Sequence, residues 1–419
     1  MLLARLQRVR GQYPSQFWLM FWGMLISTVG SSMIWPFLMI YITKKLDLPM
    51  AQAASLMTIN ATVGLISAFI AGPVIDRFGR KWIMALSLLA FGGIYSLYTQ
   101  ANSYPVLALL MGLTGLVNPL YRVGADAMMV DLIPPDKRAD AYALMRMSHN
   151  LGIAVGPVIG GTLAMTSYNF AFMGAAIGMI TYALLTALFA RETLPERAAQ
   201  PAGDASAVVA SERFGGYLHI LTDRPFMSFI FAFILTQMCA ALIWVLLSVH
   251  ANVYYGVPEN QYAFIAGTNA IMVVVFQAFV TRRTKRYPHL RVLAVGSLIY
   301  AAAVLLIGLS ASFLGFWMAM VVMTAGELML MPTSTTYTAN IAPVNMRGRY
   351  MSIYGLTWNV AQGIAPLAGG FLSDTISPSA PWFAGSVVGL VAVVAFAVLG
   401  RIASRRAQVQ GMASRGPAG

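Results

Sequence analysis

Long apolar stretches alternate with short polar ones along the whole chain of 419 residues. Each is close to the roughly 20 residues that a helix needs to cross the hydrocarbon core of a bilayer. The runs are continuous, whereas strands of a membrane barrel alternate apolar and polar positions. The pattern predicts an all-α membrane protein with twelve transmembrane helices, at about 17–42, 51–75, 82–99, 104–130, 140–166, 170–190, 226–250, 261–281, 292–311, 313–340, 350–373 and 381–400.

The overall composition agrees with this pattern. Hydrophobic residues make up 58% of the chain and charged residues only 10%. A water-soluble fold carries roughly 25% charged residues, so the composition excludes a cytosolic enzyme, a secreted disulfide scaffold and a disordered chain. The single cysteine, Cys239, has no partner for an intramolecular disulfide.

The positive charge has a topological explanation. The formal net charge is +13, and all but four of the 27 basic residues fall on one side of the predicted spans. Lys44 and Lys45 fall on the other side, and Arg122 and Arg146 fall within spans. Basic residues accumulate on cytoplasmic loops. We therefore expect a multi-pass protein of the cell (inner) membrane with both termini cytoplasmic, and the charge requires no nucleic-acid partner.

The two halves of the sequence resemble each other at an offset of 209 residues. Residues 134–138 (PPDKR) align with 343–347 (PVNMR), and the same offset pairs Asn150 with Asn359 and Pro157 with Pro366. We expect an N-terminal six-helix bundle (1–190), a cytoplasmic central loop (191–225) and a C-terminal six-helix bundle with a short cytoplasmic tail (226–419). Such repeats place a substrate site at their interface and favour alternating access by rocking.

The loop after the second predicted span reads GPVIDRFGRK over residues 72–81. It resembles the signature Gly-x-x-x-Asp-Arg-x-Gly-Arg-Lys of the major facilitator superfamily. Features of the fifth and tenth spans, described below, resemble the twelve-helix drug:proton antiporter branch of that family. The resemblance implies two pseudo-symmetric bundles and a conformational latch, formed by Gly72, Asp76, Arg77, Gly79, Arg80 and Asp131. Glycine permits close helix approach at the first position and a tight turn at Gly79. The alternative is a set of solvated loop charges.

A glycine-rich motif follows in the fifth predicted span. It resembles the antiporter-associated pattern Gly-x-x-x-Gly-Pro-x-x-Gly-Gly of the same family, which marks exporters more than importers. The resemblance implies a helix hinge or seal, formed by Gly152, Gly156, Pro157, Gly160 and Gly161. Small residues four apart also favour tight helix packing, which is the alternative.

Four residues with charged side chains lie well inside predicted spans, where each costs about 2.5–3.5 kcal/mol on insertion scales and is therefore a functional candidate. Arg122, Asp126 and Arg146 are expected to form one cluster, either functional or purely structural. The family's antiporter pattern has its span-four arginine where this chain has Met111. Glu327, near the middle of the tenth span, is predicted to load and release protons, with Asp126 as a second proton site; the alternative is a hydrogen-bonded structural glutamate.

Polar and aromatic residues near mid-span are candidates for substrate binding or for the lining of a cavity. Together with Arg122 and Arg146 they are Asn118, Trp35, Gln237, Trp244, Asn269, Trp358, Asn359 and Gln362. Each is individually more typical of helix packing.

The sequence predicts a proton-coupled secondary active exporter of amphipathic, cationic or neutral small molecules, and not an enzyme. The proton gradient is the energy source, no cofactor or metal is expected, and the partners are the substrate, protons and membrane lipids. The protein is expected to be a monomer. The alternatives are a transporter of the same fold for one defined solute, such as a sugar, lipid or siderophore, and a non-transporting receptor or scaffold.

Overall fold

The computed structural model describes residues 12–194, 220–343 and 346–413, and in these ranges all regular structure is helical. This confirms the predicted all-α class. Most of the predicted central loop (195–219) and the end of the tail (414–419) lie outside the described residues.

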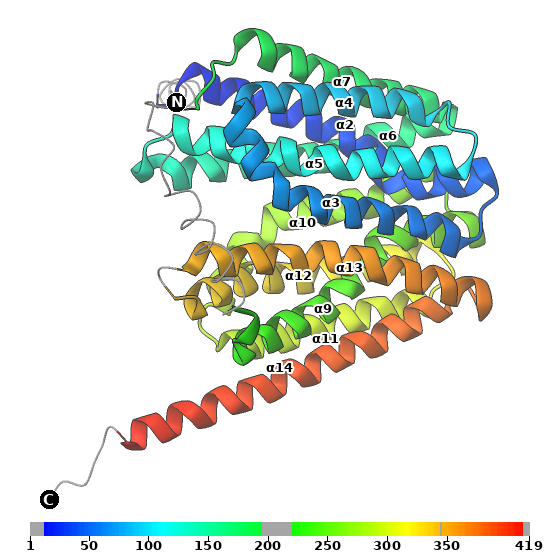
Figure 1. The fold of residues 1–419 in the computed structure, drawn as a ribbon. Helices are drawn as coiled ribbons and strands as arrows, with labels where there is room; N and C mark the ends of the chain where they lie inside the picture. The colour runs from blue at the N-terminus through cyan, green and yellow to red at the C-terminus, as the bar shows by residue number, and fades with distance from the viewer. Residues whose placement is uncertain (1–11, 195–219, 344–345, 414–419) are drawn as a thin grey trace, which may run out of the picture. The chain divides into compact units, whose positions relative to one another are not determined.

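The first half of the chain forms six α-helices, which Figure 1 labels. They are α2 (Ser15–Leu46), α3 (Met50–Phe78), α4 (Arg80–Tyr98), α5 (Tyr104–Leu132), α6 (Arg138–Thr166) and α7 (Tyr168–Phe189), with a single 3₁₀ turn, η1 (Pro135–Lys137), before α6.

The second half forms six more within the described ranges. They are α9 (Arg224–Val249), which continues as a π-helical turn, η2 (His250–Tyr254), then α10 (Glu259–Thr284), α11 (His289–Gly308), α12 (Phe313–Ile341), α13 (Arg347–Thr375) and α14 (Ala380–Ala413).

The helix boundaries repeat at the offset seen in the sequence. The first residues of α2 to α6 lie 209 residues before those of α9 to α13. The helices α5 and α12 contain 29 residues each, as do α6 and α13. Ser103 and Ser312, which precede α5 and α12, are also 209 residues apart. The offset is therefore a property of the folded chain and extends well beyond the few identical residues.

Hydropathy distinguishes two of these helices from the others. Ten helices of the described chain are long and apolar enough to cross a membrane. Hydropathy thus supports ten of the twelve predicted spans. The other two, α6 and α13, occupy equivalent positions in the two halves and have the length to span. Polar residues such as Arg146 and His149 in α6, and Asn359 and Gln362 in α13, lower their hydropathy.

The described residues pack into two compact units. Unit 1 contains the described residues up to 194 and Val245–Ile271. Unit 2 contains residues 220–244 and the described residues from Met272 onward. The first half of α10 therefore packs with unit 1 and its second half with unit 2. The predicted division at 190 and 226 follows the sequence repeat, and it stays a prediction.

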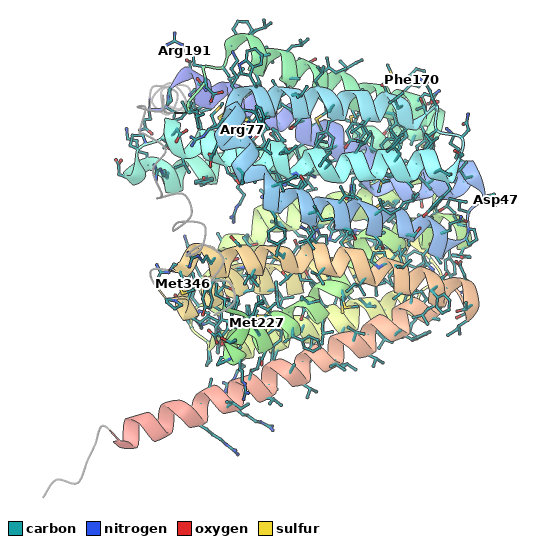
Figure 2. All side chains as sticks on the ribbon, in the orientation of Figure 1. Asp47, Arg77, Phe170, Arg191, Met227 and Met346 are labelled. Atoms are coloured by element: carbon teal, nitrogen blue, oxygen red, sulfur yellow. The ribbon has the colours of Figure 1, made fainter. Side chains whose placement is uncertain are left out.

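Unit 1 is built from three main helix pairs. Helix α3 packs on α5, α2 on α6, and α4 on α7, with further contacts of α2 with α7 and of α4 with α5. Figure 2 marks Asp47 and Phe170 at one end of these helices and Arg77 and Arg191 at the opposite end. We call these the Asp47 end and the Arg77 end of unit 1.

A buried apolar cluster closes the Arg77 end. Its aromatic part comes from the first turn of α2 and the residues just before it, where the rings of Phe17 and Tyr13 stack with centroids 4.5 Å apart. Methionines of three other helices complete it, among them Met84, Met128 and Met145. The unbranched methionine side chain fills such irregular space, and the cluster fixes the helix ends that carry the polar network described below.

In unit 2, α11 packs on both α12 and α14. Helix α9 is tied to this group by the hydroxyls of Thr236 and Ser297, 2.7 Å apart. It is also tied by Cys239, whose sulfur donates to the carbonyl oxygen of Gly385 at 3.4 Å. The one cysteine of the chain is thus a buried packing residue. Met227 and Met346 lie at the same end of unit 2 in Figure 2.

Candidate functional site

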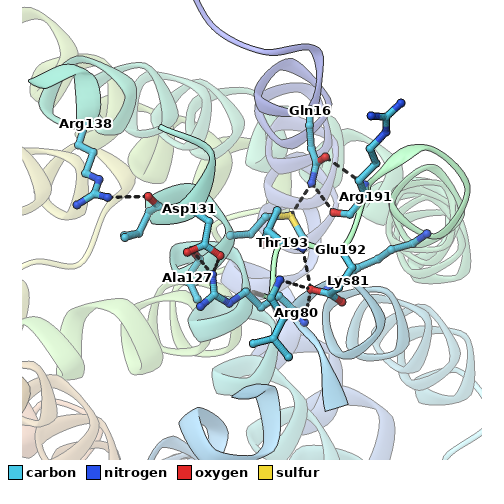
Figure 3. A network of polar contacts seen from close by, with 12 residues as sticks. Gln16, Arg80, Lys81, Ala127, Asp131, Arg138, Arg191, Glu192 and Thr193 are labelled. Carbon is cyan, nitrogen blue, oxygen red and sulfur yellow. Dashed lines mark hydrogen bonds and ion pairs between the residues drawn. The ribbon is translucent and has the colours of Figure 1, made fainter. Parts of the chain in front are cut away.

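The turn between α3 and α4, at the Arg77 end of unit 1, is held by polar contacts from several helix ends. Gly79 forms the turn with φ of +92°, a conformation that L side chains rarely adopt. The predicted tight turn at this glycine is therefore observed. The Arg80 side chain pairs with Asp131 at the end of α5 and donates to the carbonyl oxygen of Ala127 at 3.2 Å. Figure 3 shows these contacts, all of which lie within unit 1.

Glu192, just after α7, holds the same turn from the other side. Its carboxylate accepts hydrogen bonds from the backbone N–H groups of Arg80 at 3.0 Å and Lys81 at 3.1 Å, which begin α4 (Figure 3). It also accepts from Thr193 and Leu194. Partial burial raises the pKa of Glu192, but the hydrogen bonds from these four N–H groups outweigh it, and the net pKa is below the ordinary value. A carboxylate at a helix N-terminus also meets the positive end of the helix dipole.

Two further contacts connect this network to neighbouring elements. Gln16 of α2 and Arg191 exchange two hydrogen bonds, of 2.8 and 3.1 Å, between the Gln16 side chain and the Arg191 backbone. Arg138, the first residue of α6, donates to the carbonyl oxygens of Val130 at 2.8 Å and Ile133 at 3.0 Å. We call Gln16, Arg80, Asp131, Arg138, Arg191 and Glu192 the turn network. It joins the ends of α2, α4, α5, α6 and α7.

The other residues of the predicted latch behave differently. Asp76 and Arg77 are exposed, and the Arg77 guanidinium lies 5.5 Å from the centre of the Phe78 ring. A Cβ atom added to Gly72 would meet no described atom within 4 Å, so the expected close helix approach at Gly72 is not observed. The sequence did not single out Gln16, Glu192 or Arg138. For Glu192 a signal was available, since it is an acidic residue directly after a span on the basic side of the chain.

The glycines of the predicted hinge are packing positions in this structure. A Cβ atom on Gly152, Gly156 or Gly160 would overlap residues Thr28 to Met33 of α2, and for Gly160 the overlap is with Met33 backbone. At Gly161 it would meet the backbone of Glu259 and the Cβ of Ala263 in the first half of α10. The observed role is thus the close contact of α6 with its neighbours, and the hinge stays a prediction.

Charged residues of α5 and α6 form a second site in unit 1. Arg122 and Asp126 are one turn apart on α5, where i and i+4 share a helix face, and Arg122 acts electrostatically on Asp126. On α6, His149 lies within electrostatic reach of both Arg122 and Arg146. Thr28 Oγ1 of α2 lies 3.3 Å from His149 Nδ1. We call Arg122, Asp126, Arg146 and His149 the charge cluster. Its histidine was not predicted.

Glu327 lies at the middle of α12, in unit 2, and is half-buried. Tyr300 of α11 is within electrostatic reach of its carboxyl group, and the ring of Tyr300 packs against Gly326. The buried Thr324 lies on the same helix, three residues away. The carboxyl group is therefore half-buried at mid-helix depth in unit 2, near a buried tyrosine.

The predicted cavity residues are divided between the units. Unit 1 contains Trp35, Asn118 and Asn269, and unit 2 contains Gln237, Trp244, Trp358, Asn359 and Gln362. Asn269, Gln237 and Gln362 are buried, Asn118 is exposed, and the rest are half-buried. Gln237 Oε1 is buried and accepts no hydrogen bond from the described residues.

At the Asp47 end of unit 1, Glu259 binds residues of two other helices. Lys44 Nζ lies 3.0 Å from its Oε1 atom, and the Tyr168 hydroxyl donates to the same oxygen at 2.9 Å. These contacts join the end of α2 and the start of α7 to the first residue of α10. Sequence patterns did not pair these residues, because α10 belongs to the second repeat.

Comparison with known proteins identifies the family. The sequence model of the Major Facilitator Superfamily matches residues 20–258 and again residues 229–417. The chain belongs to the Major Facilitator Superfamily. It is therefore a transporter and not an enzyme, and its apolar helices make it a multi-pass membrane protein.

Relatives of this chain carry several names. A Planococcus maritimus protein named Na(+), Li(+), K(+)/H(+) antiporter is 25% identical over 360 residues, with 80% of this chain and 84% of the relative covered. A Yersinia pestis protein named multidrug resistance protein MdtH is 25% identical, with 76% of this chain and 78% of the relative covered. Among solved structures, the peptide transporter POT in complex with sulfate is similar, with a TM-score of 0.75 and 18% sequence identity. The match covers 94% of this chain and 95% of that chain. That likeness concerns the fold.

Proposed function

We propose that this member of the superfamily exports amphipathic small molecules in exchange for protons, by alternating access. The observation that carries the proposal is the half-buried carboxyl group of Glu327 at the centre of α12, a helix long and apolar enough to cross a membrane. Carboxyl groups within the membrane mark proton and ion pathways. The names of the Planococcus and Yersinia relatives, an antiporter and a multidrug resistance protein, point in the same direction.

In the proposed cycle, protons supply the energy. Glu327 takes up a proton from the outer side as substrate leaves, and loses it to the inner side as substrate binds. Asp126, in the charge cluster of unit 1, serves as a second proton site. Both termini are placed in the cytoplasm, because the basic loops lie on the same side as the termini.

The test is transport into proteoliposomes under an imposed pH gradient, with a panel of amphipathic dyes that includes ethidium. We expect gradient-driven dye movement in the wild type and a loss of at least tenfold in Glu327→Gln, because the amide cannot carry a proton. Asp47→Asn is the matched control: Asp47 is an exposed carboxylate with φ of 50°, a conformation that asparagine tolerates. Unchanged gradient-driven transport in Glu327→Gln would remove Glu327 from the coupling mechanism.

A second candidate function is the exchange of monovalent cations for protons. It is favoured by the name of the Planococcus relative, because the match to that protein covers 80% of this chain. The same proteoliposomes distinguish the two functions when Na⁺, Li⁺ or K⁺ is added in place of the dye. Proton movement that depends on the cation, without movement of any dye, would favour cation exchange.

A further inference from the structure

Arg146 is a positive charge within the membrane-spanning part of α6. It lies eight residues after Arg138, the first residue of the helix, which corresponds to about 12 Å at 1.5 Å per residue. Its side chain is exposed. Among the described residues its guanidinium donates no hydrogen bond and forms no ion pair. A charge at this depth is costly in contact with lipid, so Arg146 requires water or an anion beside it.

The nearest charged groups increase this requirement. His149 is within electrostatic reach of both Arg146 and Arg122, so two guanidinium groups raise the positive potential at its imidazole. Asp126, which interacts with Arg122, supplies one negative charge. The charge cluster therefore has a formal excess of one positive charge while His149 is neutral.

The rest of unit 1 does not compensate this excess. Helices α2 and α7, which pack against α6, contain no acidic residue. The other acidic residues described in unit 1 lie at helix ends or between helices, and they are Asp47, Asp76, Asp131, Asp136, Asp140, Glu192 and Glu259. Asp131 pairs with Arg80 and Glu259 with Lys44. Among the residues described in unit 1, one guanidinium of the charge cluster is left for a ligand, about two turns into α6.

We propose that Arg146, together with Arg122 and His149, binds the negatively charged group of an amphipathic substrate, a carboxylate or a phosphate. The planar guanidinium presents paired N–H donors that match the two oxygens of such groups. Exposed Tyr142, one turn before Arg146, and exposed Met147 offer apolar surface for the rest of the molecule. This inference rests on the proposed export of amphipathic molecules and reverses the expected charge of the substrate, which the sequence predicted to be cationic or neutral.

The test is binding of matched probes to the full chain in nanodiscs of phosphatidylcholine, a lipid without net charge. The probes are 11-(dansylamino)undecanoic acid and its primary amide, compared by dansyl fluorescence at pH 8, where the acid is ionised. We expect the wild type to bind the acid about tenfold or more tightly than the amide, the range for hydrogen bonds to a charged group. Equal affinities for acid and amide in the wild type would overturn the proposal.

Variants assign the preference to the charge cluster. In Arg146→Gln the preference for the acid is expected to disappear while the affinity for the amide is unchanged, which also shows that the variant is folded. Arg146→Lys retains the charge without the paired donors and should retain part of the preference. Arg401→Gln removes an exposed arginine in the second half of α14 and should retain the whole preference. A full preference for the acid in Arg146→Gln would overturn the assignment.

A lipid headgroup has the same chemistry as the proposed ligand, and a second arm separates the two sources. Nanodiscs with phosphatidylglycerol are compared with the neutral ones. If this lipid abolishes binding of the acid to the wild type, the site belongs to lipid and the substrate assignment is overturned. If the acid still binds, the assignment is supported.

Binding is measured without a pH gradient, so it is independent of proton coupling. If the wild type binds the acid more tightly than the amide but moves no dye under a pH gradient, the proposed function alone is contradicted. Gradient-driven export of ethidium without any preference for the acid would contradict this inference alone.

Discussion

Single residues fix the turn between α3 and α4. Gly79 supplies the positive φ, Arg80 binds Asp131, and the Glu192 carboxylate binds the first N–H groups of α4. The glycine and the arginine were predictable, because they stand in a recognisable motif. The contacts of Glu192 were not, because more than 110 residues separate it from Arg80.

The hydrogen bonds of Glu192 predict a pH dependence. Its pKa is depressed in the folded state, so its contribution to stability is present above the unfolded-state pKa of about 4.3 and is lost as the pH falls through the folded-state pKa. We expect Glu192→Gln to lower Tm at pH 7. The difference in Tm from the wild type should shrink as the pH is lowered below about 4. A difference that is constant from pH 7 to pH 3, measured by thermal unfolding in detergent, would contradict this.

At the scale of the elements, glycine spacing decides how α6 meets α2. The sequence predicted that small residues four apart would permit close packing, and Gly152, Gly156 and Gly160 do contact α2 closely. At Gly72 the same close approach is not observed, because an added Cβ atom would meet no described atom within 4 Å. Spacing along one helix shows that close approach is sterically allowed, but only the partner helix determines whether it occurs.

These two glycine positions give a matched pair of variants. Gly160→Ala places a methyl group against Met33 backbone, so we expect a loss of about 1–3 kcal/mol, typical of overpacking, and a lower Tm. Gly72→Ala meets open space and gains helix propensity, so its Tm should be equal to the wild-type value or higher. The interpretation of α6 as a packing helix fails if Gly160→Ala is as stable as Gly72→Ala.

At the scale of the whole molecule, the distribution of basic residues predicts the orientation in the membrane. The lone cysteine is buried, so Cys239→Ser provides a background for labelling. In that background we expect Asn102→Cys, exposed between α4 and α5, to react with a membrane-impermeant maleimide from outside intact cells. Arg401→Cys, exposed in the second half of α14, should react only after permeabilisation. The reverse pattern would place both termini outside.

The sequence by itself determined the class of the fold, the repeat and the positions of nearly all helices. Apolar runs of membrane-spanning length leave the backbone few alternatives to a helix, and the two halves of one repeat begin their helices at the same offset. Only the tertiary structure decided which polar groups meet. Glu192 with the start of α4, Glu259 with Lys44, and His149 with Arg122 join residues in or next to different helices. Side chains of that kind are brought together by helix packing, which local sequence patterns do not encode.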